Sequence, residues 1–283
     1  MTYPGPVVSA EWLAEHVNDP TVRVVDATVH LPDTGRNAKE EYLQVHIPGA
    51  GFFNFDEIAD PQNSLPRKFP PKAVLEQAAG ALGIDNSTHV IAYDTPGLYS
   101  AARVWWLFRQ FGHDRVSILD GGLKQWMAEG WALQSGPVSL PEKTFITGGE
   151  RDLLARWPSV LSASGNTGEQ IIDARTPGRF AGTEQDRYPG TRAGHIPNSL
   201  NLYWADLLEA GTRKLLPSEQ LRERFSKAGI TWDKPVTATC GSGLTACILA
   251  LGLHLCGKDD WKVYDGSWDE WGRREDLPVV GPG

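Results

Sequence analysis

One short segment of the chain contains residues that could carry out a reaction: Cys240-Gly-Ser-Gly-Leu-Thr-Ala246. It lies between an apolar run and a helical pattern and is predicted to be a loop. Its glycines allow unusual backbone angles, so amide N–H groups can point inward at the start of the helix and bind an anion. A helix N-terminus also favours the thiolate form of a cysteine. The loop therefore predicts that Cys240 is a nucleophile, whose negatively charged product is held by backbone amides.

The cysteine count supports a single working thiol. The other two cysteines, Cys247 and Cys256, lie in the helical pattern that follows, and we interpret them as small apolar residues of the interior. An odd number of cysteines without a Cys-x-x-Cys pair argues against a disulfide scaffold and against a cysteine zinc site. No metal is expected.

The segments that must position this loop occur twice in the chain, as a sequence repeat. Three segments recur in the same order, 145 to 149 residues further along: residues 22–27 as 170–174, His46-Ile-Pro as His195-Ile-Pro, and Asp120-Gly-Gly-Leu-Lys-Gln-Trp126 as Asp265-Gly-Ser-Trp-Asp-Glu-Trp271. A period of this length corresponds to a small domain rather than to a solenoid repeat. Trp126 and Trp271 occupy matching places, which is typical of packing anchors.

Each copy predicts the same architecture. Short β-branched runs alternate with helical patterns, which indicates an α/β fold with a mainly parallel sheet flanked by helices. Ser9 and Ser218 precede amphipathic segments and are predicted helix caps. Residues 134–149, rich in Gly, Pro, Ser and Thr, are the predicted linker. We place the first domain at residues 1–133 and the second at residues 150–283.

The two copies differ at the position of the nucleophile. Alignment between the shared segments places Asp94 of the first copy opposite Cys240 of the second. A carboxylate cannot act as a sulfur nucleophile, and it would repel another anion from the same cradle. We therefore expect the first domain to be catalytically silent.

Together, the tandem arrangement, both His-Ile-Pro segments, the Asp120-Gly-Gly segment and the Cys240 loop resemble the two-domain rhodanese family. The loop is most similar to that of the family's 3-mercaptopyruvate sulfurtransferases. The resemblance implies a second domain whose cysteine accepts a sulfane sulfur as a persulfide. The sulfur then passes to a thiol, such as that of a thioredoxin-like protein, or to cyanide. The resemblance also implies that no metal or organic cofactor is needed.

The charge of the loop separates two sulfur donors. Thiosulfate is a compact dianion, and the family's thiosulfate-specific enzymes carry cationic side chains just after the cysteine. Here those positions are Gly241 and Ser242, and the loop has no charge at all. 3-Mercaptopyruvate instead presents a carboxylate and a ketone, which call for an arginine fork and a hydroxyl near the sulfur. We expect 3-mercaptopyruvate as the donor and thiosulfate as a side activity.

Arginines for such a fork lie in the second copy, ahead of His195. By resemblance, Arg179 matches the arginine of the family's Gly-Arg-Phe segment, and Arg187 matches the second substrate arginine. The family's Glu-Pro-Arg context is absent around Arg187. Arg192 is therefore an alternative for the second position.

The remaining loop residues also receive expected roles. Ser242 and Thr245 can hydrogen-bond the sulfur or polarise the substrate carbonyl, although either hydroxyl can instead cap the next helix. Gly241, Gly243 and Leu244 contribute backbone amides rather than side chains.

His46 leaves two interpretations open. Its place in a repeated His-Ile-Pro turn, shared with His195, indicates a role in the fold. It also matches a first-domain histidine of the family that has been proposed to assist proton transfer. Asn37 occupies the place where a family aspartate would be expected as its partner.

Composition argues against several other classes of protein. The chain has 27 Lys and Arg against 35 Asp and Glu and no long basic run, so nucleic-acid binding is not expected. No apolar run is long enough to span a membrane and no secretory signal is visible, so we expect a cytoplasmic protein. A phosphatase of related fold would need an arginine where Ala246 stands. A non-enzymatic persulfide carrier is the alternative from a different class.

Overall fold

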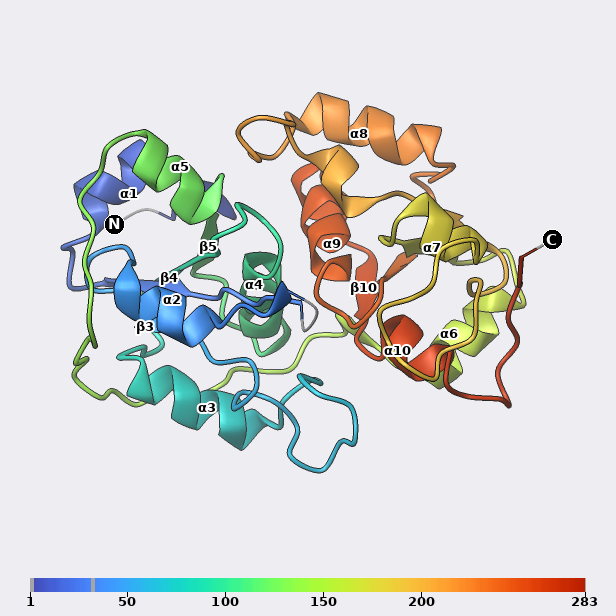
Figure 1. Cartoon of the computed structure of the whole chain (residues 1–283), viewed down its shortest axis with the longest axis horizontal. Coiled ribbons are helices and arrows are strands. Elements are labelled where there is room, and N and C mark those ends of the chain that lie inside the picture. The colour runs from blue at the N-terminus through green and yellow to red at the C-terminus, as the bar shows by residue number, and fades with distance from the viewer. Residues whose placement is uncertain (1–2, 32–33, 283) are drawn as a thin grey trace. The chain divides into compact units, whose positions relative to one another are not determined.

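A computed structural model describes residues 3–31 and 34–282 of the chain (Figure 1). It divides into two compact units. Unit 1 consists of Met1–Arg151 and Ala210–Lys214, and unit 2 consists of Asp152–Glu209 and Leu215–Gly283. Each unit contains one five-stranded sheet, and every pairing between its named strands is parallel. The structure confirms the predicted α/β fold in two tandem copies.

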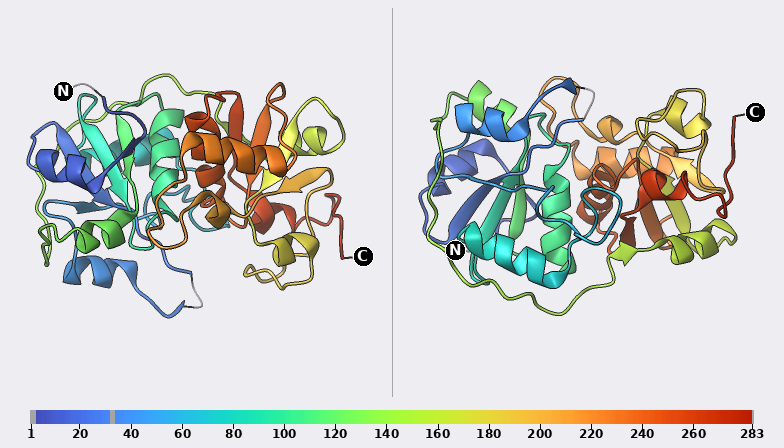
Figure 2. Two further views of the ribbon diagram at one scale, coloured as in Figure 1. Left: turned by 90° about the horizontal axis from the view of Figure 1, so that it is seen from above. Right: turned by 60° about the horizontal axis from the view of Figure 1, so that its bottom comes forward.

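Unit 1 has its strands in the order β1-β5-β4-β2-β3. The strands are Val7–Val8 (β1), Val22–Asp26 (β2), Gly51–Phe52 (β3), His89–Tyr93 (β4) and Val116–Leu119 (β5). The helices are Ala10–His16 (α1), Ala38–Gln44 (α2), Lys72–Ala81 (α3), Ala101–Gln110 (α4) and Gly122–Ala128 (α5). Helices lie on both faces of the sheet (Figure 2).

Unit 2 repeats this topology with the order β6-β10-β9-β7-β8. Its strands are Leu154–Ala155 (β6), Gln170–Asp173 (β7), Ser199–Asn201 (β8), Val236–Thr239 (β9) and Trp261–Tyr264 (β10). Its helices are Trp157–Ser164 (α6), Pro177–Ala181 (α7), Ser218–Lys227 (α8), Ala246–Leu255 (α9) and Ser267–Trp271 (α10), with a 3-10 turn at Trp204–Leu207 (η2). None of the described helices is long and apolar enough to cross a membrane.

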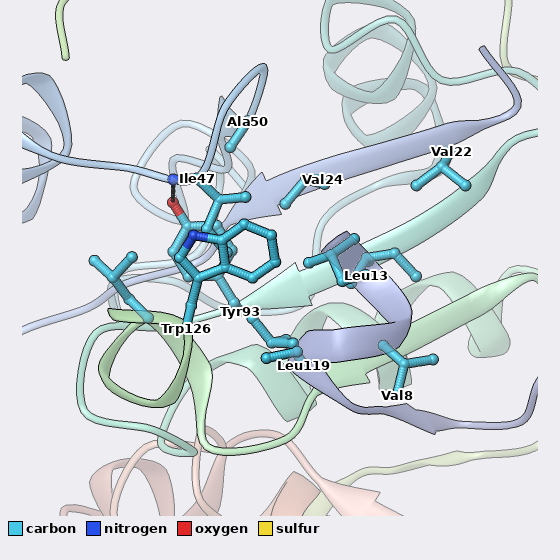
Figure 3. Close-up of a cluster of buried hydrophobic side chains, with 12 residues drawn as sticks. Val8, Leu13, Val22, Val24, Ile47, Ala50, Tyr93, Leu119 and Trp126 are labelled. Carbon is cyan, nitrogen blue, oxygen red and sulfur yellow. Dashed lines mark hydrogen bonds between the residues drawn. The ribbon is translucent and has the colours of Figure 1, made fainter. Parts of the chain in front are cut away.

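The two repeated tryptophans pack in matching cores. Trp126 of α5 joins Leu13 of α1 and the strand residue Tyr93 in one buried cluster of unit 1 (Figure 3). Trp271 belongs to the corresponding cluster of unit 2. Both indoles are almost fully buried, and each donates its N–H to a backbone carbonyl, at Ala132 and Pro278 respectively. Burial of such large rings stabilises each sheet–helix layer by roughly 1.5–3 kcal/mol.

The segment predicted as a linker packs closely against unit 1. The amide of Lys143 donates to the carbonyl of Gly80 in α3, and the Lys143 ammonium lies 2.9 Å from an Asp85 carboxylate oxygen. Thr147 donates to the Glu76 carboxylate through both its amide and its hydroxyl. Residues 134–149 are therefore an ordered edge of unit 1, while the exact domain boundaries stay a prediction.

Asp26 and Asp173 end the matching strands β2 and β7, yet their surroundings differ. Asp173 is paired with the buried Arg175, whose Nη2 lies 2.8 Å from Asp173 Oδ2. Thr28 stands at the place of Arg175 in unit 1, and no described cation pairs with Asp26. Burial consequently raises the pKa of Asp26 to about 6.

Asp26→Asn is expected to stabilise the protein at about pH 8 and to change little at about pH 4. The Asp26 carboxyl is uncharged in both folded and unfolded chains below its ordinary pKa of 3.8, and its stabilising contribution is lost as the pH rises through about 6. The difference in unfolding free energy reaches about 3 kcal/mol at neutral pH. Urea unfolding across this pH range measures it.

Asp173→Asn is the matched control, because it removes a carboxylate that has a buried cationic partner. It leaves Arg175 undercompensated, so we expect a loss of about 3–5 kcal/mol at neutral pH. Parallel pH profiles for Asp26→Asn and the unaltered protein would contradict the prediction for Asp26.

Candidate active site

Cys240 stands between the end of a buried strand and the start of a buried helix. Strand β9 ends at Thr239 and α9 begins at Ala246, so the intervening loop lies at the carboxyl edge of the parallel sheet. The Cys240 side chain is only 2% exposed. Gly243 has a φ of +89°, a left-handed conformation that favours glycine, and its amide donates to Cys240 Sγ at 3.1 Å. The loop thus turns back on its own cysteine.

The matching loop of unit 1 holds a buried carboxyl group. The Asp94 carboxylate is fully buried and accepts four backbone amides. Gly97 donates to Oδ1 at 3.0 Å, whereas Tyr99, Ser100 and Ala101 all donate to Oδ2 at 2.8 Å. This loop shape therefore directs four backbone amides at one buried carboxyl group, an arrangement that suits an anion.

Alignment of the two repeats allows the Asp94 loop to be compared with the Cys240 loop. Asp94 aligns with Cys240, and Gly97 aligns with Gly243, which uses the same amide on the sulfur. The carboxylate oxygens of Asp94 are two bonds from Cβ, and so is the outer sulfur of a persulfide on Cys240. The amide of Cys247, which aligns with Ala101, donates instead to the Leu244 carbonyl at 3.2 Å. The shared feature of the two loops is thus the glycine amide that donates to the aligned side chain.

Ser267 is a site residue that the sequence analysis missed. It begins α10 with a φ of +51°, a conformation that is strained for a side chain with a Cβ. Its hydroxyl accepts the Cys240 amide at 3.1 Å, lies 3.8 Å from Cys240 Sγ and donates to the Tyr264 carbonyl. Unit 1 has Gly122 here, with a φ of +59°. The replacement of glycine by serine only in the cysteine-containing repeat was the signal available in the sequence.

The structure links Arg179 and Arg187 through one carboxylate. Arg179 belongs to α7, where its Nε donates to Thr176 Oγ1, and its Nη1 lies 3.8 Å from Asp186. Arg187 is exposed, and its backbone amide donates to Asp186. Asp186 in turn pairs with the buried Arg175 at 2.8 Å. The loop that carries Arg187 is therefore anchored in the interior of unit 2.

Burial alone would lower the pKa of Arg175. The neighbouring carboxylates of Asp173 and Asp186 outweigh this effect and raise the pKa above its ordinary value. The guanidinium also lies 4.3 Å from the ring centre of Trp268, whose amide donates to the Cys240 carbonyl. Arg175 thus connects the arginine loop with the backbone of the cysteine loop.

Arg192, the alternative to Arg187, has a different environment. Its guanidinium donates to the backbone carbonyls of Trp271, Gly272 and Arg274. These bonds hold the segment after α10 in place, so the geometry supports a role for Arg192 in the fold.

His46 and His195 have the same surroundings in their separate units. His46 Nδ1 donates to the Tyr42 carbonyl at 2.7 Å, and its ring stacks on Tyr42. His195 Nδ1 donates to the Phe180 carbonyl at 2.9 Å and stacks on Phe180. His46 is completely buried, and its Nε2 has no hydrogen-bond partner among the described residues. The repetition favours a fold role for both rings, while a role of His46 in proton transfer stays a prediction.

The other expected site residues lie in or near the loop. Ser242 is half-buried, whereas Gly241, Gly243, Leu244 and Thr245 are buried. Thr245 precedes α9, but its side chain makes no capping hydrogen bond. Helix capping therefore does not explain why a residue with a hydroxyl stands at position 245.

Asn37 is a helix cap. Its side-chain oxygen accepts the amides of Lys39 and Glu40 at the start of α2. Within the described residues, no group of three or more His, Cys, Asp or Glu side chains is arranged to hold a metal ion.

Comparison with known proteins agrees with the repeated fold. A model of the rhodanese-like domain matches residues 9–129 and again residues 158–274. The chain belongs to the rhodanese family. This rhodanese is 41% identical to the 3-mercaptopyruvate sulfurtransferase of Escherichia coli, with 96% of each chain covered. It is also 40% identical to the thiosulfate sulfurtransferase of Gallus gallus, over 95% of this chain and 93% of that protein.

A solved structure supports the same assignment. The crystal structure of the 3-mercaptopyruvate sulfotransferase SseA from Escherichia coli superposes on this rhodanese with a TM-score of 0.85 at 38% identity. The match covers 95% of this chain and 99% of that chain. Because relatives named for either sulfur donor have nearly the same overall identity, residues of the site must decide the donor.

Proposed function

We propose that this rhodanese is a 3-mercaptopyruvate sulfurtransferase that works through a persulfide on Cys240. The observation that carries the proposal is the cysteine loop, which has no charged side chain and whose Gly243 amide donates to Cys240 Sγ, as the Gly97 amide donates to the buried Asp94 carboxyl group in unit 1. Such a loop stabilises an anionic sulfur through preorganised amides, and it offers no cation to attract a free dianion.

In the first half-reaction, the Cys240 thiolate attacks the sulfur of 3-mercaptopyruvate. A sulfur–sulfur bond forms, and the carbon–sulfur bond of the donor breaks. Its electron pair enters the enolate of pyruvate, which takes up the proton of the donor thiol at carbon and leaves as pyruvate. Cys240 retains the persulfide anion, and the Gly243 amide already points at its inner sulfur.

Side chains around the loop would hold the donor. Arg179 and Arg187 bind its carboxylate, since a guanidinium fork matches two carboxylate oxygens. The Ser242 and Thr245 hydroxyls donate to the ketone or to the sulfur. Ser267 fixes the inner end of the loop through the Cys240 amide.

In the second half-reaction, an acceptor thiolate attacks the outer sulfur and the Cys240 thiolate leaves. Two half-reactions that share one covalent intermediate predict ping-pong kinetics. We propose a small thiol or a thioredoxin-like protein as the acceptor. We also propose a cytoplasmic location.

The donor preference is the test of this proposal. We expect the kcat/KM for 3-mercaptopyruvate to exceed that for thiosulfate by about 100-fold, because a missing charge-assisted clamp costs roughly 1.5–3 kcal/mol. Initial rates are measured with one acceptor, cyanide, so that only the donor differs. A preference for thiosulfate would overturn the proposed donor and would favour a thiosulfate sulfurtransferase.

A further inference from the structure

Tyr188 lies directly on the residue that follows the nucleophile. A Cβ placed on Gly241 would stand 2.5 Å from Tyr188 Cε2 and 2.9 Å from Tyr188 Oη. Carbon atoms do not approach other atoms so closely, so no side chain fits at position 241 unless Tyr188 moves. Gly241 does not have a left-handed φ. Its glycine is therefore required by this contact and not by the backbone conformation.

Tyr188 is held from both sides. Two residues before it, Asp186 pairs with the buried Arg175 at 2.8 Å. Three residues after it, Thr191 donates its amide and its hydroxyl to the Tyr188 carbonyl. Arg192 then fixes the chain to the segment after α10. These anchors, which include a buried ion pair, fix the backbone from which the ring reaches Gly241.

The Gly241 side of the contact is equally well fixed. The Gly241 carbonyl accepts the Asp269 amide at 2.8 Å, and the preceding Cys240 carbonyl accepts the Trp268 amide at 3.0 Å. The backbone of the Gly241 loop and the backbone at Tyr188 are therefore both held by hydrogen bonds. A side chain at position 241 fits only if the Tyr188 ring turns away from the loop.

We propose that Tyr188 is a specificity-determining residue, because it occupies the space in which a cationic side chain at position 241 would stand. This inference rests on the proposed function. A lysine or arginine at that position would place a positive charge beside the sulfur cradle and favour a compact dianionic donor. The phenol instead provides a neutral aromatic surface, which leaves donor binding to the more distant arginines and favours an α-keto acid.

The test compares substitutions at position 241 in two backgrounds. Gly241→Ala in the unaltered protein is expected to slow alkylation of Cys240 by iodoacetamide and sulfur transfer by about 10-fold or more, since overpacking costs typically 1–3 kcal/mol. In the Tyr188→Ala background the same substitution is expected to have less than about 2-fold effect, because the excluding ring is gone. Tyr188→Phe keeps the ring, so Gly241→Ala should remain harmful there.

A second pair of variants tests whether a positive charge at position 241 favours thiosulfate. Gly241→Lys with Tyr188→Ala is expected to raise the kcat/KM for thiosulfate by about 10-fold or more over Tyr188→Ala alone, the effect of one charge-assisted contact. Gly241→Lys alone should give no such gain. Circular dichroism melting shows that each variant is folded before its rates are compared.

Two results would overturn the inference. Equal losses from Gly241→Ala with and without Tyr188 would show that the ring does not exclude a side chain. A thiosulfate gain from Gly241→Lys alone, or none in the double variant, would show that Tyr188 does not control the charge of the loop. Failure of the proposed function is separate, because it appears as a thiosulfate preference of the unaltered protein, while alkylation still reports the coupling of Tyr188 to Gly241.

Discussion

Cys240→Ser is expected to lower sulfur transfer from either donor by at least about 10⁴-fold, as removal of a covalent nucleophile does in other enzymes. A serine hydroxyl is uncharged at neutral pH and cannot form a persulfide. Initial rates with 3-mercaptopyruvate and cyanide measure the loss. Intact mass after incubation with donor alone should show the gain of one sulfur atom in the unaltered protein and none in the variant.

Cys256→Ser is the matched control for this substitution. Cys256 follows α9 as its C-cap in a half-buried position, and its thiol donates to the Ser218 carbonyl, a bond that a serine hydroxyl can also make. We expect its activity to stay within about 2-fold of the unaltered protein, as for substitutions away from a functional group. Normal sulfur transfer by Cys240→Ser would exclude the persulfide mechanism.

The same mass measurement separates an enzyme from a persulfide carrier. A carrier would gain one sulfur atom on Cys240 but would not return to the free thiol at a useful rate when a small thiol is added. An enzyme returns to the free thiol during each turnover. Each turnover requires that the acceptor thiolate attack the outer sulfur, because the Cys240 thiolate must be the leaving group.

Features carried by local sequence could be predicted well. The repeated segments predicted two parallel α/β units, and Trp126 and Trp271 lie in matching cores. Ser9 caps α1 as predicted, since its hydroxyl accepts the Trp12 amide. The cap predicted at Ser218 was wrong. The N-cap is Pro217, whose carbonyl accepts the Leu221 amide at 2.9 Å, so Ser218 is already inside the helix.

Features that depend on contacts between distant segments could not be predicted. Tyr188 and Gly241 are far apart in sequence, and the reason for glycine at position 241 becomes visible only when the ring is placed. The strained backbone of Ser267 belongs to a turn that unit 1 shares at Gly122, and the bonds of the Ser267 hydroxyl to Tyr264 and Cys240 become visible only in the structure. A one-dimensional pattern contains the residue types of such contacts but not their geometry.

Arg179→Gln is expected to lower the kcat/KM for 3-mercaptopyruvate by about 10- to 100-fold, the value of a charge-assisted hydrogen bond to a carboxylate. The loss should appear mainly in KM, because the carboxylate is bound before and during carbon–sulfur cleavage. Arg179→Lys keeps the charge but not the two-pronged geometry, so we expect only part of the activity to return. Steady-state rates with both donors measure these effects.

The surroundings of Arg179 make this prediction specific. Its side chain is 11% exposed, and the 3.8 Å separation from Asp186 is longer than a direct hydrogen bond, so the guanidinium keeps donors for a substrate carboxylate. Arg192, by contrast, donates to three backbone carbonyls. Arg192→Gln should therefore lower the melting temperature with a smaller effect on KM. We do not expect Arg192 to bind the donor, because it would have to exchange its bonds to the backbone for bonds to the substrate. A larger KM effect from Arg192→Gln than from Arg179→Gln would contradict this and would assign the substrate contact to Arg192.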